Sequence, residues 1–517
     1  MKEKSIKKNA FLNTLKTFLT LFFPLITFPY SSRILGPSIL GKVNFAQGIV
    51  SYFSLIASLG LHSYAVREIA KNRDDKQKMN AIVRELWTIN LVSTVISYVL
   101  LFLTVCFVTK LHEYKGLIII CSTLIMFNTF GLNWIYEAFE EYTYITIRSL
   151  IFQVISVVLL FTMVRSSEDY LQYAAVNIIS NVGANILNLF HARKFISLKK
   201  NDSEKLQIKR HLKPVFILFS SAIAATFFSS LDTTMLGFLS SDEQVGFYSA
   251  GAKIVRMVRN LFPAVTAVMI PRIAYYLSKD DEKSILELEK KAFNFLFCFA
   301  LPISAGFLLL MKPLVLLFCG EHYVNAILVS KIMSPFIFCS AISSFTCSLL
   351  VVYGMERYTI HRMAITAVVD FVLNFILIPK YGANGAAVAT LVAEILFVVI
   401  DCAFLRKYLA KVQMIKSIIQ FFIALIVMCV CVYFSRNLFE NLVLQLVTGF
   451  AAGVVSYGGV LVAIRNQYVL ELYSSIIEKL RGKPIKAETE NLIHNIGFFL
   501  LLALLVYVTF NDILRLF

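Results

Sequence analysis

The stretch "LVSTVISYVLLFLTVCFV", residues 91–108, decides the class of fold, because it is apolar almost throughout. A strand of a membrane barrel would alternate apolar and polar residues with a period of two, and this stretch does not. Apolar runs of about twenty residues, the length that crosses a bilayer as a helix, recur along nearly the whole chain. The chain is 58% hydrophobic and only 16% charged, and its mean hydropathy is +0.74. The sequence therefore predicts an all-α polytopic membrane protein and excludes a transmembrane β-barrel.

These runs predict fourteen transmembrane helices, and "NIGFFLLLALLVYVTF" near 495–510 is a candidate fifteenth. The basic N-terminal segment lacks a small-residue cleavage pattern, so its apolar run is interpreted as a retained first helix and not as a cleaved signal. The predicted spans are 10–32, 42–66, 81–108, 115–137, 144–164, 170–192, 214–238, 246–270, 291–318, 324–352, 360–379, 383–405, 414–434 and 441–463.

The basic residues predict the orientation of the chain. Most of the 49 Lys and Arg residues fall in alternate loops, which places the N-terminus in the cytoplasm. The net charge of +17 is thus a consequence of topology and of attraction to anionic lipid heads, and we expect no nucleic-acid partner. Apolar residues also recur at helical spacing among charges near residues 469–480, so this segment is expected to lie flat in the membrane interface.

Motifs for catalysis and for tightly bound cofactors are absent from the sequence. It contains no GxxxxGK[ST] loop, no HExxH and no CxxC pair. The nine cysteines lie in apolar segments, and none of the seven histidines pairs at ligand spacing. The predicted outer loops are also too short for a catalytic domain. We therefore expect a protein that is not an enzyme and needs no metal or other cofactor, with coupling to H⁺ or Na⁺ left open.

An internal repeat divides the chain. "ILGPSILGKVNFAQGI" (34–49) parallels "MLGFLSSDEQVGFYSAGAKI" (235–254), with Gly41 matching Gly246 at an offset of 205. Six helices in each half give both copies the same orientation, and in transporters built this way the substrate binds near the midplane between the halves. The predicted units are a six-helix lobe over 1–205, a second over 206–410, and additional C-terminal helices over 411–517.

Three cations interrupt one predicted span. Lys253, Arg256 and Arg259 are spaced by three residues, so they share one face of a helix. Facing lipid they would together cost about 8–10 kcal/mol, so they need a polar interior or acidic partners. One interpretation is a salt bridge between Lys253 and Asp232, which lies at similar depth in the preceding span. The other is a path for an anion, because arginine holds phosphate through a bidentate fork.

Further polar residues are candidates for the same path. Arg33 ends the first predicted helix, which two prolines are expected to bend, and it is assigned to the anion path. Neutral side chains recur on one face of the span 42–66 and on one face of the span 170–192. Amides and hydroxyls suit sugar hydroxyl groups, whereas the alternative is hydrogen bonding between closely packed helices. The assigned sugar-binding residues are Asn44, Gln47, Ser51, Asn181 and Asn185.

Buried charges in the second half suggest a coupling role or a structural network. Asp370 and Glu394 fall at similar depth in adjacent predicted helices. Two such carboxylates could share a proton or bind Na⁺, and Lys331 could neutralise one of them. Together with Asp232 these residues are assigned as structural pairs or coupling residues.

Four stretches carry a family resemblance. They are "PYSSRILGPSILGKVNFAQGIVSYFSLIASLGLHSYAVREIAKNRDD" (29–75), "LDTTMLGFLSSDEQVGFYSAGAKI" (231–254), "MIPRIAYYL" (269–277) and "IPKYGANGAAVATLVAEI" (378–395). The chain resembles, over about residues 10–465, the Wzx-type flippases that carry O-antigen and capsule repeat units. These belong to the multidrug/oligosaccharidyl-lipid/polysaccharide (MOP) exporter superfamily.

The resemblance implies a V-shaped, MATE-like pair of lobes in the bacterial cytoplasmic membrane. It implies flipping of undecaprenyl-pyrophosphate-linked oligosaccharide to the outer leaflet by alternating access, with a polymerase and export machinery as partners. The family usually has Asp-Lys where this chain has Asp232-Thr233, which leaves the acidity of the substrate open. The alternatives are a lipid II-type flippase and a MATE-like drug or cation exporter, and the cations at 253–259 argue against the exporter.

Overall fold

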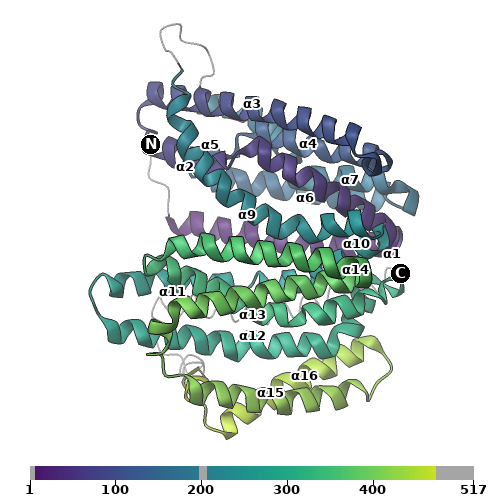
Figure 1. The fold of residues 1–517 in the computed structure, drawn as a ribbon, viewed down its shortest axis with the longest axis vertical. Helices are drawn as coiled ribbons and strands as arrows, with labels where there is room; N and C mark the ends of the chain where they lie inside the picture. Colours follow the sequence, from purple (N-terminus) through teal and green to yellow (C-terminus); the bar gives the residue numbers. More distant parts are fainter. Residues whose placement is uncertain (1–5, 197–205, 473–517) are drawn as a thin grey trace.

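The computed structural model describes residues 6–196 and 206–472, and the regular structure in these ranges is helical throughout (Figure 1). Nine of the described helices are long and apolar enough to cross a membrane, and ten are when the two parts of α9 count as one span. The predicted all-α polytopic fold is therefore confirmed. The helices are α1 (Ile6–Ser58), α2 (Leu61–Lys71), α3 (Lys76–Phe107), α4 (Lys115–Gly131), α5 (Asn133–Ala138), α6 (Tyr142–Met163), α7 (Tyr170–Ile178), α8 (Asn185–His191), α9 (Lys209–Leu239), α10 (Asp242–Arg259), α11 (Pro263–Leu277), α12 (Glu282–Cys319), α13 (Ala326–Val352), α14 (Glu356–Leu409), α15 (Ile415–Arg436) and α16 (Leu442–Ala463).

Two of these helices, α1 and α14, fold back on themselves at a glycine. A straight helix of 53 or 54 residues would be about 80 Å long, more than twice the hydrocarbon thickness of a bilayer. The backbone turns at Gly36 (φ 70°) and at Gly382 (φ 54°), values that glycine adopts without strain. A Cβ on Gly385 would lie 2.5 Å from the carbonyl oxygen of Leu377, whereas a straight helix would separate these residues by about 12 Å. Each hairpin therefore supplies two of the predicted spans.

Three predicted spans end earlier than expected. The span 115–137 stops at Gly131, because Leu132 adopts a left-handed backbone conformation (φ 45°) before α5 begins. The span 42–66 stops at Ser58, because Leu59 and Gly60 adopt left-handed backbone conformations (φ 47° and 68°), and α2 then begins a new direction. The span 246–270 stops at Arg259, and α11 starts at Pro263, a residue that favours the first turn of a helix because it lacks the N–H.

The predicted span 170–192 is not a regular α-helix. Residues Ile179–Gly183 form a π-helical turn, η3, between α7 and α8. A π turn inserts one extra residue, which rotates the following side chains by about 100° around the helix axis. Asn181 and Asn185 therefore do not share a face, contrary to the prediction from their four-residue spacing.

The helices pack in four groups (Figure 1). In the middle lie α1, α9, α10 and α14, with α3, α4, α6 and α7 on one side and α11, α12 and α13 on the other. The pair α15 and α16 packs on α12 at the outer end of the molecule. The lobe boundaries at 205 and 410 stay a prediction. The predicted interfacial segment continues past residue 472, and the candidate span 495–510 lies outside the described residues.

Equivalent segments of the two repeats meet where α1 crosses α10. A Cβ on Gly41 would lie 1.7 Å from the carbonyl oxygen of Asp242, and a Cβ on Gly246 would lie 2.0 Å from that of Pro37. Asp242 and Pro37 are related by the same offset of 205 as the two glycines. The contact is thus reciprocal, as expected of two copies related by a pseudo-twofold axis, and it supports the register of the sequence repeat.

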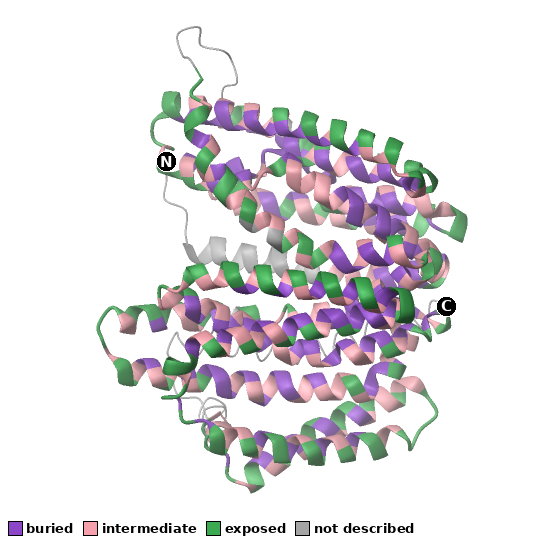
Figure 2. Cartoon of the chain, in the orientation of Figure 1, coloured by how far each residue is buried: buried purple, intermediate pink, exposed green. Residues whose placement is uncertain are grey.

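The outer faces of the helices are apolar as well as exposed. Figure 2 shows exposed surface along the outward sides of α3, α15 and α16. These helices carry Phe102, Phe434 and Val455, with 68%, 65% and 73% of their surface exposed. Soluble proteins rarely expose apolar surface on this scale, whereas lipid chains would cover it.

Candidate functional site

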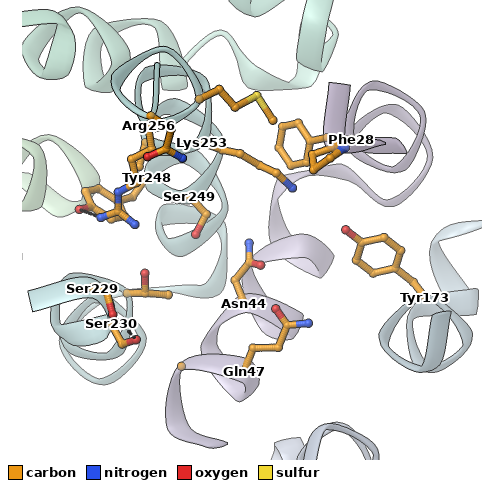
Figure 3. Close-up of a pocket in the computed structure, with 16 residues that line it drawn as sticks. Phe28, Asn44, Gln47, Tyr173, Ser229, Ser230, Tyr248, Ser249, Lys253 and Arg256 are labelled. Atoms are coloured by element: carbon orange, nitrogen blue, oxygen red, sulfur yellow. Dashed lines mark hydrogen bonds between the residues drawn. The ribbon is translucent and has the colours of Figure 1, made fainter. Parts of the chain in front are cut away.

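A cavity of about 420 Å³ lies between α1, α7, α9 and α10, and we call it the cationic cavity. Lys253 and Arg256 of α10 line one wall, and Asn44 and Gln47 of α1 line the wall facing them (Figure 3). Phe28, from the other arm of the α1 hairpin, lines the same space. The structure thus brings together four of the predicted substrate-binding residues.

The side chain of Lys253 extends toward Phe28 (Figure 3), with Nζ 4.1 Å from the centroid of the aromatic ring. Such a cation–π contact stabilises an ammonium group without neutralising its charge. The interpretation of Lys253 as the salt-bridge partner of Asp232 is wrong, because the Asp232 carboxylate is bound by Tyr248, Asn374 and Thr390.

Arg256 lies at the border between the cationic cavity and the protein interior. Its Nη2 is 4.0 Å from Oδ2 of Asp232 and 3.5 Å from the hydroxyl oxygen of Tyr248. A third of its side chain remains exposed, whereas the Asp232 side chain is 2% exposed. Asp232 is therefore an acidic partner of Arg256, which the sequence did not predict.

Five buried side chains of α9, α10 and α14 form a hydrogen-bonded group that we call the Asp232 cluster. Tyr248 donates its hydroxyl to the Asp232 carboxylate, and Thr390 donates to Asp232 Oδ2 at 2.9 Å. Asn374 Nδ2 donates to Asp232 Oδ1 at 2.8 Å and to Asp370 Oδ1 at 3.2 Å. The amide thus bridges two carboxylates that are each 1% exposed.

The remaining predicted coupling residues are not in this cluster. Glu394 accepts a hydrogen bond from Ser343 of α13 and not from Asp370, so the predicted Asp370–Glu394 pair is wrong. Their similar distance from the span ends does not bring the two carboxylates together, because Asn374 joins Asp370 to Asp232 instead. Lys331, on α13, is half-buried and forms no ion pair with a described residue.

Two predicted members of the anion path lie outside the cationic cavity. The guanidinium of Arg259 lies 5.7 Å from the ring centroid of Phe336 and interacts electrostatically with Glu394. Arg33 is exposed, and its Nη2 donates to the carbonyl oxygen of Leu317 at 2.7 Å, at the end of α12. Arg259 is the last residue of α10 and lies about 120° around the helix from Lys253, so its side chain contacts α13 and not the cationic cavity.

A second cavity of about 480 Å³ adjoins the first, and we call it the neutral cavity. Gln47, Ser229 and Ser230 line both cavities. No charged side chain of a described residue lines the neutral cavity. The polar residues that line it are Gln47, Ser51, Ser54, Ser58, Asn181, Thr226, Ser229 and Ser230. Those on α9 were not predicted, although "SSLDTT" at 229–234 is a run of small polar residues that could have indicated them.

Asn185 lines neither cavity. Its side chain is buried, and Nδ2 donates to the Phe127 carbonyl oxygen at 3.2 Å and to Asn128 Oδ1 at 3.3 Å. Its Oδ1 accepts from Arg148 at 3.3 Å. The alternative interpretation, hydrogen bonding between packed helices, therefore describes Asn185, because the π turn directs it away from Asn181.

Comparison with known proteins identifies the family. The family model described as "Polysaccharide biosynthesis protein" matches residues 6–277, more than half of the chain. The chain belongs to this family. It is also 24% identical, over 78% of its length and 97% of the relative, to the "Putative O-antigen transporter" of Escherichia coli K12. The protein of the same name in Shigella dysenteriae is 24% identical over 76% of this chain and 98% of its own.

Solved structures show the same fold. The lipid II flippase MurJ, in an inward closed conformation, matches with a TM-score of 0.71 and 16% identity over 88% of this chain and all of its own. An inward-facing MATE-family multidrug resistance transporter of the MOP superfamily matches with a TM-score of 0.54 and 14% identity, over 77% of this chain and 96% of its own. The resemblance to the Wzx-type family and the MOP-like fold are therefore confirmed.

Proposed function

We propose that this family member is a flippase for oligosaccharide repeat units linked to undecaprenyl pyrophosphate. The observation that carries the proposal is a cationic cavity joined to a neutral, polar cavity between α1, α9 and α10. A lipid-linked oligosaccharide carries these two chemistries next to each other, a pyrophosphate followed by sugars. The transporter names of the relatives support the same class of function, and no enzymatic activity is proposed.

Lys253 and Arg256 are the proposed pyrophosphate ligands. Both line the cationic cavity. Lys253 forms no ion pair with a described residue, and the carboxylate of Asp232 lies 4.0 Å from Arg256, so neither charge is closely neutralised. A guanidinium and an ammonium can together hold several phosphate oxygens through charge-assisted hydrogen bonds. Arg259 and Arg33 lie outside the cavity, so any contact with the substrate would have to occur in another conformation.

The neutral cavity is the proposed sugar site, with Gln47, Ser51 and Asn181 among its ligands and Asn44 on the cationic side. The prenyl chain would remain in the bilayer, against the exposed apolar faces of the helices. The reciprocal crossing of α1 and α10 is consistent with a cycle of alternating access, in which the two repeats move apart at one end of the molecule and together at the other.

The Asp232 cluster is the proposed coupling site for H⁺ or Na⁺. Two buried carboxylates bridged by one amide are costly to keep charged together, and a proton or a cation between them would remove that cost. Arg256 connects this cluster to the cationic cavity, so loading of the cluster and binding of an anion are expected to affect each other.

The orientation and the partners follow from the same proposal. The bias of Lys and Arg residues supports a cytoplasmic N-terminus in the bacterial cytoplasmic membrane. The flipped lipid-linked oligosaccharide would pass to a polymerase and export machinery for a surface polysaccharide such as O-antigen or capsule. A lipid II-type activity is the second candidate. Lipid II presents the same pyrophosphate, and the fold shared with MurJ supports this candidate.

The test is a flipping assay in proteoliposomes with a fluorescent undecaprenyl-pyrophosphate oligosaccharide. Arg256→Ala removes a charge-assisted contact worth about 1.5–3 kcal/mol, so transport at low substrate concentration should fall by about 10- to 150-fold. Arg67→Ala removes the same group from the exposed face of α2, where 67% of the side chain is exposed, and should change transport less than twofold. Equal transport by both variants would remove the cationic cavity from the proposal, and a wild type without flipping would refute the proposal as a whole.

A further inference from the structure

The polar groups of the neutral cavity carry an inference about the sugars themselves. We infer that this cavity selects uncharged sugars rich in hydroxyl groups and disfavours sugars that carry a carboxylate. The inference rests on the proposed function, since it concerns the head group of the same lipid-linked substrate. It follows from the direction of the hydrogen bonds in the cavity wall and from the position of the cations.

Several serines in the wall have already used their only O–H. Ser58 donates to the Leu55 carbonyl oxygen at 3.0 Å, and Ser229 donates to that of Thr226 at 3.1 Å. The hydroxyl of Ser51 lies 2.7 Å from the carbonyl oxygen of Gly48 and 3.1 Å from Oγ of Ser230, and its one hydrogen serves one of them. A serine that has donated its hydrogen offers a ligand only lone pairs. These parts of the wall therefore accept hydrogen bonds and cannot donate them.

Sugar hydroxyl groups fit such a wall, and carboxylates do not. A hydroxyl can donate to the serine oxygens and also accept, whereas an ionised carboxylate only accepts. The donors left in the wall are neutral, namely the amides of Gln47 and Asn181 and the hydroxyls of Ser54, Thr226 and Ser230. A carboxylate there would face unshared lone pairs without a compensating cation, and burying a charge in this way is unfavourable.

The amides give the site its orientation. Gln47 makes no hydrogen bond with a described residue and lines both cavities, so its N–H groups and its oxygen are available where pyrophosphate and first sugar would meet. Asn181 donates one N–H to the Asn177 carbonyl oxygen at 2.9 Å and keeps its second N–H and its oxygen for a ligand. Lys253 and Arg256 lie in the adjoining cavity, so negative charge on the substrate is directed to that side.

The test compares two substrates that differ only at C6 of their sugars. Both carry a disaccharide on undecaprenyl pyrophosphate, one with hydroxymethyl groups and the other with carboxylates. In proteoliposomes of the full chain, wild type should flip the neutral lipid about tenfold faster than the acidic one at low concentration, a difference of about 1.4 kcal/mol. Thr226→Lys and, independently, Ser54→Lys place a cation in the wall and should reduce this preference to about twofold or reverse it. Gln77→Lys adds the same charge at the exposed start of α3 and should leave the preference unchanged.

Each outcome separates this inference from the function on which it rests. Flipping of both lipids at the same rate would leave the flippase function in place and overturn the selectivity. A tenfold preference that neither lysine variant alters, while both variants still flip the neutral lipid, would also overturn it, because the preference would then arise elsewhere. If the wild type flips neither lipid, the proposed function fails and the inference fails with it.

Discussion

Replacement of Gly41 or Gly246 with alanine perturbs the point where the two repeats touch. The added Cβ of Gly41→Ala would lie 1.7 Å from the Asp242 carbonyl oxygen, and ordinary contact begins at 3.4 Å, so the backbones must separate by about 1.7 Å. For Gly246→Ala the separation needed from Pro37 is about 1.4 Å. Overpacking of this kind costs about 1–3 kcal/mol, which is a shift of about 5- to 150-fold away from the arrangement in this structure. Because the clash lies between the two repeats and not within one of them, separation of the repeats at the crossing of α1 and α10 should relieve it.

Spin labels on both sides of the crossing would measure that movement. Glu113, in η1 (Thr109–Tyr114), and Glu321, in η5 (Glu321–Tyr323), are both exposed. The neighbour of Glu113, Tyr114, donates to Asp242 at 2.6 Å, and Gly320 packs on Arg33, so both label sites lie near the crossing. In a background without the native cysteines, both alanine variants should increase the population of long distances between the labels.

The same substitution elsewhere in a helix provides the control. A Cβ on Gly306 or on Gly458 would meet nothing within 4 Å, so alanine there should leave the distances unchanged and stabilise the helix by up to about 1 kcal/mol. The reasoning is refuted if Gly41→Ala and Gly246→Ala give the same distance distribution as Gly458→Ala. A change in only one of the two would contradict the reciprocity of the contact.

Four further substitutions test individual side chains. Asn185→Ala leaves buried groups unpaired, so it should lower the free energy of unfolding by about 1–3 kcal/mol and should not change transport per folded molecule. Asn181→Ala should instead weaken transport without lowering the midpoint of thermal unfolding. Tyr248→Phe removes the hydroxyl that donates to Asp232 and should destabilise by about 1–3 kcal/mol in a thermal unfolding assay, with Tyr381→Phe at an exposed position as a neutral comparison. Asp401→Leu leaves the buried guanidinium of Arg362 without its carboxylate and should cost about 3–5 kcal/mol, and a loss below about 1 kcal/mol would show that Arg362 finds another partner.

Hydropathy was sufficient to predict the spans, and local backbone geometry limited their boundaries. Most predicted spans correspond to a described helix or to one arm of a hairpin, because about twenty apolar residues can satisfy their backbone in lipid only as a helix. The spans that are instead divided between two helices are 42–66, 115–137, 170–192 and 246–270. The left-handed Leu59 and the π turn at 179–183 were missed, because neither changes the hydropathy of its segment. Apolar periodicity reports which residues avoid water, and it is insensitive to a one-residue insertion in a helix that is apolar on most faces.

The candidate site was predicted in composition but only partly in its pairing. The cations at 253 and 256 and the amides at 44 and 47 do line one cavity, because the offset of 205 relates two helices that pack on each other. The partner of Asp232 was wrongly assigned, since depth in the membrane does not fix the rotation of a helix about its axis. Asn374 and Thr390, two members of the Asp232 cluster, carry no charge, and matching of opposite charges therefore could not indicate them as partners of Asp232.

Arg256 lies between the Asp232 cluster and the cationic cavity and connects the two physically. At 4.0 Å from Asp232 and one-third exposed to the cationic cavity, it is held by the carboxylate less closely than a direct ion pair would hold it. Under the proposed function, a phosphate entering the cavity would compete with Asp232 for the same guanidinium, and a proton or cation that neutralised Asp232 would release the guanidinium toward the cavity. By thermodynamic reciprocity, the factor by which the cation changes substrate affinity equals the factor by which the substrate changes cation affinity. Under the proposed function, a single arginine between a buried carboxylate and an open cavity is therefore enough to couple the two binding events, without a conformational relay between distant sites.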